Sequence, residues 1–138
     1  MFFKSKKTTN KNIDLIKVAA LLIHAAKIDE NFSEKEEKII KETLLKIGAN
    51  SENLDEVMLN AKKYEENANQ ILEFTKQVKN MAEEDKEKIV ESLWKIVYSN
   101  NKADIYETSL MRRLAGLLYI DNKTMGDIKE KIKKENSQ

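Results

Sequence analysis

The fold is decided by residues 13–48, IDLIKVAALLIHAAKIDENFSEKEEKIIKETLLKIG. Apolar side chains in its first half recur at the 3.6-residue spacing of an amphipathic helix, which we expect from about Asn12 to Ile28. Ser33-Glu34-Lys35-Glu36 then has the pattern of a capping box, in which the serine and the glutamate each satisfy a backbone N–H of the other. A second helix follows and ends at Gly48. The stretch therefore predicts a helical hairpin with a polar elbow.

The same pattern returns 71 residues later. Asp104-Ile105-Tyr106-Glu107 forms a second capping box, and the shift carries Glu36 onto Glu107 and Asp29 onto Asn100. Apolar positions of the two helices also fall on apolar positions, as in Val18 and Ile89, Leu22 and Leu93, Ile23 and Trp94, Ala26 and Val97, Ile39 and Leu110, Ile40 and Met111, and Ile47 and Leu118. We therefore expect an all-α bundle built from two pseudo-symmetric helical-hairpin repeats.

Between and after the repeats, polar residues mark further helix ends. Ser51 is placed to cap a third helix, and a break is expected at Asn67-Ala68-Asn69 before a fourth. Glu84-Asp85 supply the acidic first turn of the next helix, and a last short helix follows Asp121-Asn122. The apolar stripes predict that six residues are mostly buried, namely Ile23, Ile40, Phe74, Trp94, Leu114 and Leu118. His24 and its repeat partner Lys95 are expected to be exposed.

The composition excludes several classes of protein. With 138 residues the chain is long enough for one domain with a real core. Hydrophobic residues make up 41% and charged residues 36%, which is too apolar for intrinsic disorder and too evenly charged for a membrane protein. The absence of proline and the three glycines disfavour sandwiches and barrels. Without cysteine and with a single histidine, thiolate and polyhistidine metal sites are excluded, and a serine-type triad is disfavoured.

The charge balance predicts neither a nucleic-acid partner nor a membrane span. The 25 basic and 24 acidic residues give a net charge of +1, far from the basic footprint of a protein that neutralises phosphates. The longest apolar run, Val18–Ile23, is much shorter than the ~20 residues that cross a bilayer, so we expect a cytoplasmic protein. We expect a flexible basic tail over residues 1–11, one helical domain over residues 12–133 and a flexible end over residues 134–138. Only the tail, through Met1–Lys7, is a candidate for membrane contact.

The two elbows hold the residues with the best potential for chemistry. The first offers carboxylates at Asp29, Glu30 and Glu36, and the second offers Asp104, Glu107 and the amide oxygen of Asn100. Such hard oxygen ligands suit a divalent cation, calcium or magnesium. The alternating ligands and central glycine of an EF-hand are absent from the sequence. The alternative interpretation is structural, because Glu36 and Glu107 also complete capping boxes.

At these residues the sequence resembles the TerB-like tellurite-resistance proteins, as a small stand-alone member. The resemblance covers nearly the whole chain and is most specific from Trp94 to Glu107. Further parts of it are Ala19-Ala20-Leu21-Leu22, Asp29–Glu36, Phe74-Thr75 and Arg112–Leu118. It implies an all-α bundle of about seven helices built from two repeats, with an acidic surface patch thought to take divalent metal ions. It implies no known reaction.

The sequence departs from the family pattern at both elbows. The family's Asp-Gly pair falls on Asp29-Glu30 and on Asn100-Asn101. Glutamate tolerates a positive φ less well than glycine, and an asparagine in place of the aspartate removes one carboxylate from the second elbow. The first elbow is therefore expected to be the better cation site.

Residues outside the elbows are interpreted as structural. We expect Trp94 to fill the seam between the repeats, although tryptophan also anchors partner surfaces. Tyr98 is expected to place its ring in the core and its hydroxyl near an elbow carboxylate. Arg112 is expected to pair with Glu107 or Asp104 on its own helix, at little gain in stability. His24 is expected on an exposed rim without a catalytic role.

Three classes of function follow from this sequence. The favoured one is a non-enzymatic protein-interaction or stress-response module that presents its elbows, with a weak divalent-cation site, to another protein. The alternative is a metal-dependent, hydrolase-like enzyme that uses elbow carboxylates such as Asp29 and Glu36, although such sites usually gather acids or histidines from several helices. Nucleic-acid binding is disfavoured: it would depend on Lys4, Lys6, Lys7 and Lys11 and on the lysines of the last helix, but charges elsewhere in the sequence alternate and cancel. A TerB-like domain preceding a J-domain is a further alternative, but the chain contains no J-domain signature.

Overall fold

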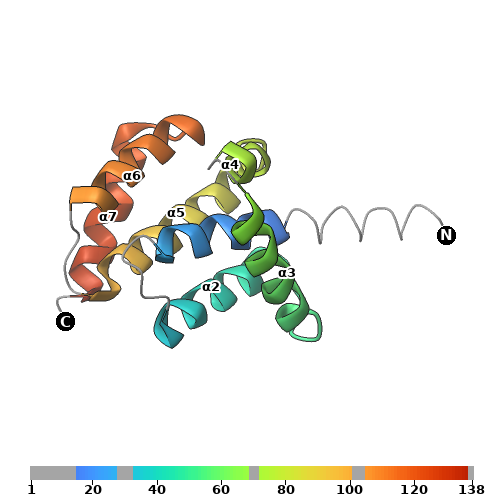
Figure 1. Ribbon diagram of the computed structural model, residues 1–138. Helices are drawn as coiled ribbons and strands as arrows, with labels where there is room; N and C mark the ends of the chain where they lie inside the picture. Colours follow the sequence, from blue (N-terminus) through green and yellow to red (C-terminus); the bar gives the residue numbers. More distant parts are fainter. Residues whose placement is uncertain (1–14, 28–32, 69–71, 101–104, 137–138) are drawn as a thin grey trace.

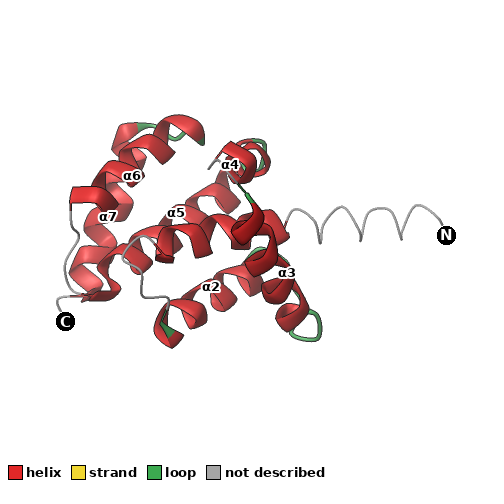
Figure 2. Cartoon of the chain, in the orientation of Figure 1, coloured by secondary structure: helices red, strands yellow, loops and turns green. Residues whose placement is uncertain are grey.

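The computed structural model describes residues 15–27, 33–68, 72–100 and 105–136 (Figure 1), with side chains over 15–27, 33–68, 73–99 and 109–135. Seven α-helices make up these ranges, which contain no strand (Figure 2). The helices are the first helix (residues 15–26), α2 (Glu34–Lys46), α3 (Leu54–Asn67), α4 (Leu72–Lys79), α5 (Glu83–Val97), α6 (Ile105–Leu117) and α7 (Asn122–Asn136). A 3-10 turn, η2 (Tyr98–Asn100), follows α5. The predicted all-α fold is confirmed.

Two helices form the centre of the bundle. The first helix crosses the middle of the molecule in Figure 1, and every side chain from Val18 to Ile23 is almost fully buried. Over these six residues burial extends around the whole circumference, beyond the single broad face that the sequence predicted, whereas Lys17 and His24 on the same helix are only partly buried. Ala19 and Ala20 are fully buried, and their small side chains permit neighbouring helices to approach closely. α5 is the second central helix and packs against both α2 and α7.

The predicted core is confirmed. Six predicted residues are buried, namely Ile23, Ile40, Phe74, Trp94, Leu114 and Leu118. The expected exposure of His24 and Lys95 is met only in part, because their side chains keep 37% and 31% of their accessible surface. Each is partly covered because it pairs with a carboxylate, Glu65 for His24 and Glu91 for Lys95.

The helix ends agree with the sequence at α2 and differ at α3 and α7. Ser33 is the N-cap of α2 and forms the predicted capping box. Ser51 does not cap α3, because that helix begins at Leu54 with Asn53 in the N-cap position. The side chain of Asn53 instead accepts a hydrogen bond from the backbone N–H of Asn50 at 3.2 Å, which closes the turn before the helix. The last helix is not short, since α7 contains 15 residues.

Helix bounds recur at the 71-residue offset of the sequence repeat. Adding 71 to the bounds of α2 gives those of α6, and the last residue of the first helix, residue 26, falls on Val97, the last residue of α5. Gly48 and Tyr119 are also 71 residues apart, and both have a positive φ, 122° and 57°. The second capping box, at residues 104–107, lies outside the described side chains. That the two hairpins superpose stays a prediction.

The ends of α2 and α6 share one hydrogen-bond pattern. Ala49 N donates to Leu44 O at 2.9 Å, and Ile120 N donates to Ala115 O at 3.0 Å, each spanning five residues. In both helices the left-handed residue also donates to a carbonyl three residues earlier, at 3.4 Å and 3.3 Å. This pair of bonds defines a Schellman motif, which usually has glycine at the left-handed position. α2 follows that preference, whereas α6 carries a tyrosine.

A buried lysine stabilises the end of α6. Lys86, near the start of α5, donates from its ammonium to the carbonyl oxygen of Leu118 at 3.1 Å. A second, longer contact of 3.5 Å joins the ammonium to Glu83. Because the carbonyl groups at a helix C-terminus carry partial negative charge, a buried cation is favourable there.

Candidate functional site

The first elbow ends in a tightly bonded capping box. The backbone N–H and the hydroxyl of Ser33 both donate to Oε1 of Glu36, at 2.9 and 3.0 Å, and the N–H of Glu36 donates to the Ser33 hydroxyl at 3.2 Å. Glu36 is only 2% exposed. A carboxylate this buried is stabilised by the donors around it. The capping interpretation of Glu36 is therefore confirmed, and any metal ligation by this residue would compete with the cap.

The remaining predicted ligands lie outside the described side chains. Asp29, Glu30 and Asp104 are outside the described residues, whereas Asn100 and Glu107 are described only in their backbone. Among the described residues, no three histidine, aspartate or glutamate side chains form a group that could hold a metal ion. Glu36 is thus the single predicted ligand whose surroundings are seen. A cation site at either elbow stays a prediction.

The structure brings the ends of the two elbows together. The ammonium of Lys35, at the start of α2, donates to the carbonyl oxygen of Ser99 in η2 at 3.3 Å. We call the surface around Ser33–Lys35 and Tyr98–Asn100 the elbow face. The Ser99 hydroxyl donates to Ile96 O at 2.7 Å and fixes the turn. Because an ammonium group repels other cations, Lys35 lowers the attraction of this face for a divalent ion.

A second cluster joins the first helix to α3. Glu65 Oε2 lies 3.2 Å from Nδ1 of His24, and Glu65 Oε1 accepts a hydrogen bond of 2.8 Å from Lys27. The side chain of Glu65 is 10% exposed. Burial alone would raise the pKa of this carboxyl, but the hydrogen bonds and charges of Lys27 and His24 outweigh burial and hold its pKa below the usual value. Glu65 therefore stays ionised and clamps the two helices together.

This cluster was missed by the sequence reasoning, because no motif marks Glu65 and its partner His24 is 41 residues away. A histidine held by a carboxylate is a common arrangement in catalytic sites. In the described part of the chain, however, no hydroxyl group bonds to the other side of His24, whose ring packs at 5.7 Å from Phe74. Both carboxylate oxygens of Glu65 are also engaged. The cluster is suited to holding helices rather than to activating a nucleophile.

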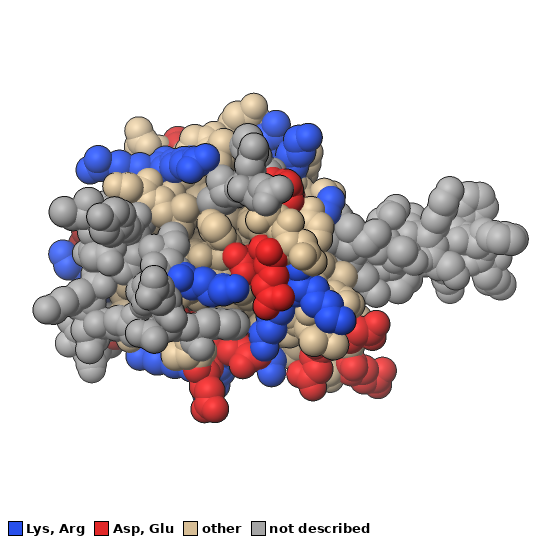
Figure 3. All heavy atoms as spheres, in the orientation of Figure 1, with Lys and Arg blue, Asp and Glu red and all other residues tan. Residues whose placement is uncertain are grey.

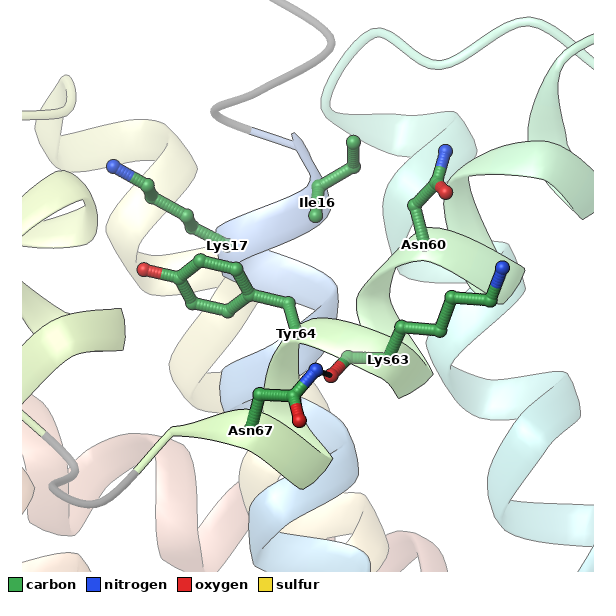
Figure 4. A pocket seen from close by; sticks show the side chains of 6 residues that line it. All are labelled: Ile16, Lys17, Asn60, Lys63, Tyr64 and Asn67. Atoms are coloured by element: carbon green, nitrogen blue, oxygen red, sulfur yellow. Dashed lines mark hydrogen bonds between the residues drawn. The ribbon is translucent and has the colours of Figure 1, made fainter.

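A pocket of about 360 Å³ lies between the first helix and α3 (Figure 4). Its polar groups do not converge. In Figure 4 the ammonium groups of Lys17 and Lys63 point to opposite sides, and Asn67 donates to the carbonyl oxygen of Lys63 at 3.0 Å. Lys17 contacts Gln77 at 3.5 Å. Binding sites for small molecules combine an apolar wall with a few convergent polar groups, and this pocket lacks that convergence among the described residues that line it.

Charged side chains of both signs lie on the face seen in Figure 3. Acidic side chains gather at its lower right, around α2 and α3, and Lys and Arg side chains line its upper edge, around α6 and α4. The described side chains of this face form no continuous basic surface of the kind typical of nucleic-acid-binding proteins. None of the described helices is long and apolar enough to cross a membrane.

The described helices define the class of the protein as an all-α domain of about seven helices. The family model of the tellurite resistance protein TerB matches residues 15–130, and the chain therefore belongs to the TerB family. This confirms the resemblance seen in the sequence. No curated protein and no solved structure matches the chain.

Proposed function

We propose that this TerB-family chain is a non-enzymatic helical module that binds another protein through its elbow face. The observation that carries the proposal is the contact of Lys35 with Ser99, because these two residues, 64 apart in the chain, bring the ends of the two elbows together. The helices behind them, α2 and α5, pack directly on each other. A rigid surface built from two segments lowers the entropy that is lost when a partner binds.

The described chemistry favours binding over catalysis. Glu36 caps α2, and Glu65 is held by His24 and Lys27, so the buried carboxylates with described surroundings serve the fold. A hydrolase-like enzyme would need acids that point together into a hollow and bind a metal. The proposal therefore assigns no catalytic residue. It places the module in the cytoplasm and in a stress response, and the support for this role is that the family is named for tellurite resistance.

We further propose a weak site for calcium or magnesium at the first elbow. Its ligands would be Asp29, Glu30 and Glu36, and a weaker second set would be Asn100, Asp104 and Glu107. Calcium takes six to eight oxygens, so three carboxylates need backbone carbonyls and water to complete the shell. The cap of Glu36 and the ammonium of Lys35 both weaken such a site.

The partner proposal is tested with a photo-crosslinking residue at two positions. Glu34 is exposed at the elbow face, whereas Glu52 is exposed beyond the opposite end of α2 and serves as the matched control. In extracts of the host cell, we expect a discrete crosslinked product from position 34 that unlabelled protein competes away, and none from position 52. Equal products from both positions, or none from position 34, would contradict an elbow interface.

The cation proposal is tested by calorimetric titration of the metal-free full chain with calcium and with magnesium. We expect weak binding, on the order of millimolar, because few ligands are charged. Asp29→Asn should weaken it, and Asn100→Asp should strengthen the second site. If neither ion binds at millimolar concentration, the cation site is abandoned, and the interaction surface is judged by the crosslinking alone.

A further inference from the structure

A pocket of about 170 Å³ opens among α5, α6 and α7. Trp94 of α5 lines it, although this residue is only 2% exposed. Met111, Ala115 and Met125 supply the rest of its apolar wall. A cavity of about 150 Å³ with apolar walls can hold benzene. The pocket is therefore large enough for a ligand with one ring.

The indole N–H of Trp94 has a weak partner in this pocket. It points to Sδ of Met125 at 3.3 Å. A thioether sulfur is a poor acceptor, whereas buried tryptophan N–H groups usually donate to oxygen. Met125 also lines the pocket, and methionine changes conformation easily. An oxygen atom of a ligand that displaced the sulfur would give this buried donor a stronger acceptor.

Two cations line the same pocket. They are Arg112 of α6 and Lys129 of α7, whose ammonium lies 5.4 Å from the centre of the Trp94 ring. No acid is among the described residues that line the pocket, and neither cation forms an ion pair with an acid in the described part of the chain. Asp104 and Glu107, the partners expected for Arg112, lie outside the described side chains. An arginine guanidinium matches the planar geometry of a carboxylate. The pocket is thus suited to an anion.

A glycine keeps the pocket open. Gly126 lies inside α7, where glycine costs about 1 kcal/mol relative to alanine. A Cβ atom at this position would meet no atom within 4 Å, so packing in the described structure does not require glycine. Because Gly126 lines the pocket, a larger side chain there would occupy part of it.

We propose that this pocket binds a small organic carboxylate whose apolar body is about the size of one aromatic ring. The carboxylate accepts hydrogen bonds from Arg112 and from the indole N–H of Trp94, and Lys129 adds attraction at the rim. The apolar body packs against the methionine and alanine side chains. This site is separate from the cation and partner sites proposed for the elbows, and its success or failure leaves those proposals unchanged.

The first test compares three probes by calorimetry and by the fluorescence of Trp94, which is the chain's single tryptophan. Benzoate has both the negative charge and the apolar ring of the proposed ligand, benzyl alcohol lacks the charge, and inorganic phosphate lacks the apolar body. We expect benzoate to bind saturably with a Kd on the order of 1 mM, as suits a ligand of this size. Benzyl alcohol and phosphate should each bind roughly 10-fold more weakly. Equal affinity for either, or no benzoate binding at about 10 mM, would overturn the proposal.

The second test uses two matched pairs of variants, each checked for folding by circular dichroism. Arg112→Gln should weaken benzoate binding by roughly 10-fold, whereas Arg113→Gln, its exposed neighbour outside the pocket, should leave binding unchanged. Gly126→Leu should abolish binding, whereas Gly116→Leu, in α6 and also outside the pocket, should not. Benzoate binding that survives Gly126→Leu, or that falls equally in both arginine variants, would refute the assignment.

Discussion

The two Schellman motifs allow a test of how much the residue at the left-handed position contributes to stability. α2 ends with Gly48 and α6 with Tyr119, in the same hydrogen-bond pattern. A side chain in the left-handed region costs about 1–2 kcal/mol, which glycine avoids. We therefore expect Gly48→Ala to destabilise the protein and Tyr119→Gly to stabilise it.

The magnitude depends on two opposing terms at Tyr119. Glycine removes the strain of the left-handed conformation but lowers stability by about 0.5–1 kcal/mol, because it gives the unfolded chain more conformational freedom. The net gain in the free energy of unfolding for Tyr119→Gly is therefore about 0.5–1 kcal/mol. Tyr119 is 69% exposed, but the ammonium of Lys79 lies 5.0 Å from the centre of its ring, a contact worth about 0.5–1 kcal/mol at an exposed site. The exchange is therefore made in a Lys79→Gln background, where this contact is already absent. Gly48→Ala should cost about 1 kcal/mol, which corresponds to about 3–4 °C in Tm for a chain of this size.

The assay is urea unfolding followed by circular dichroism. It compares the parent chain with Gly48→Ala, and Lys79→Gln with Lys79→Gln/Tyr119→Gly. We expect the first substitution to lower the free energy of unfolding and the second to raise it, with unchanged dependence on urea. A lower stability of the double variant than of Lys79→Gln would refute the strain argument, because the tyrosine ring would then stabilise α6 by contacts other than the lysine.

Three further predictions concern groups that hold helices. Glu36→Ala should lower the free energy of unfolding by about 1–2 kcal/mol in a thermal melt, and Glu36→Gln by clearly less, because glutamine keeps the acceptor of the capping box. Lys86→Met should lower the free energy of unfolding in urea by about 1–3 kcal/mol, since the Leu118 carbonyl loses its donor. The matched control is Lys88→Met; because Lys88 is half-exposed, this change should alter stability by less than about 0.5 kcal/mol. The pKa of Glu65 is lower in the folded than in the unfolded chain, so its contribution is complete above the ordinary pKa of 4.5 and is lost as pH falls through the folded value. Acid titration should show a smaller loss of stability below pH 4.5 in Glu65→Gln than in the parent chain, and equal losses would exclude the clamp.

At the candidate sites, the sequence could predict interactions between residues close in the chain but not those between distant residues. Glu36 could be assigned as a capping residue from sequence because its partner, Ser33, is three residues away and the geometry of a helix start is local. The meeting of the elbows could not be predicted, because Lys35 and Ser99 are brought together by the packing of α2 on α5. The prediction that Ser51 caps α3 was wrong for a related reason. Several polar residues precede this helix, and the hydrogen bond between Asn50 and Asn53 closes the turn that sets where it begins.

The sequence by itself determined the helices, the capping of α2 and the identity of the core, because these depend on a periodicity and on contacts spanning three or four residues. The tertiary structure alone decided that the middle of the first helix, Val18–Ile23, is buried on all sides, that Glu65 joins His24 to Lys27, and that Trp94 lines a pocket with two cations. These features depend on how helices cross. The crossing is set by the summed packing of many side chains, which no local pattern in the chain encodes.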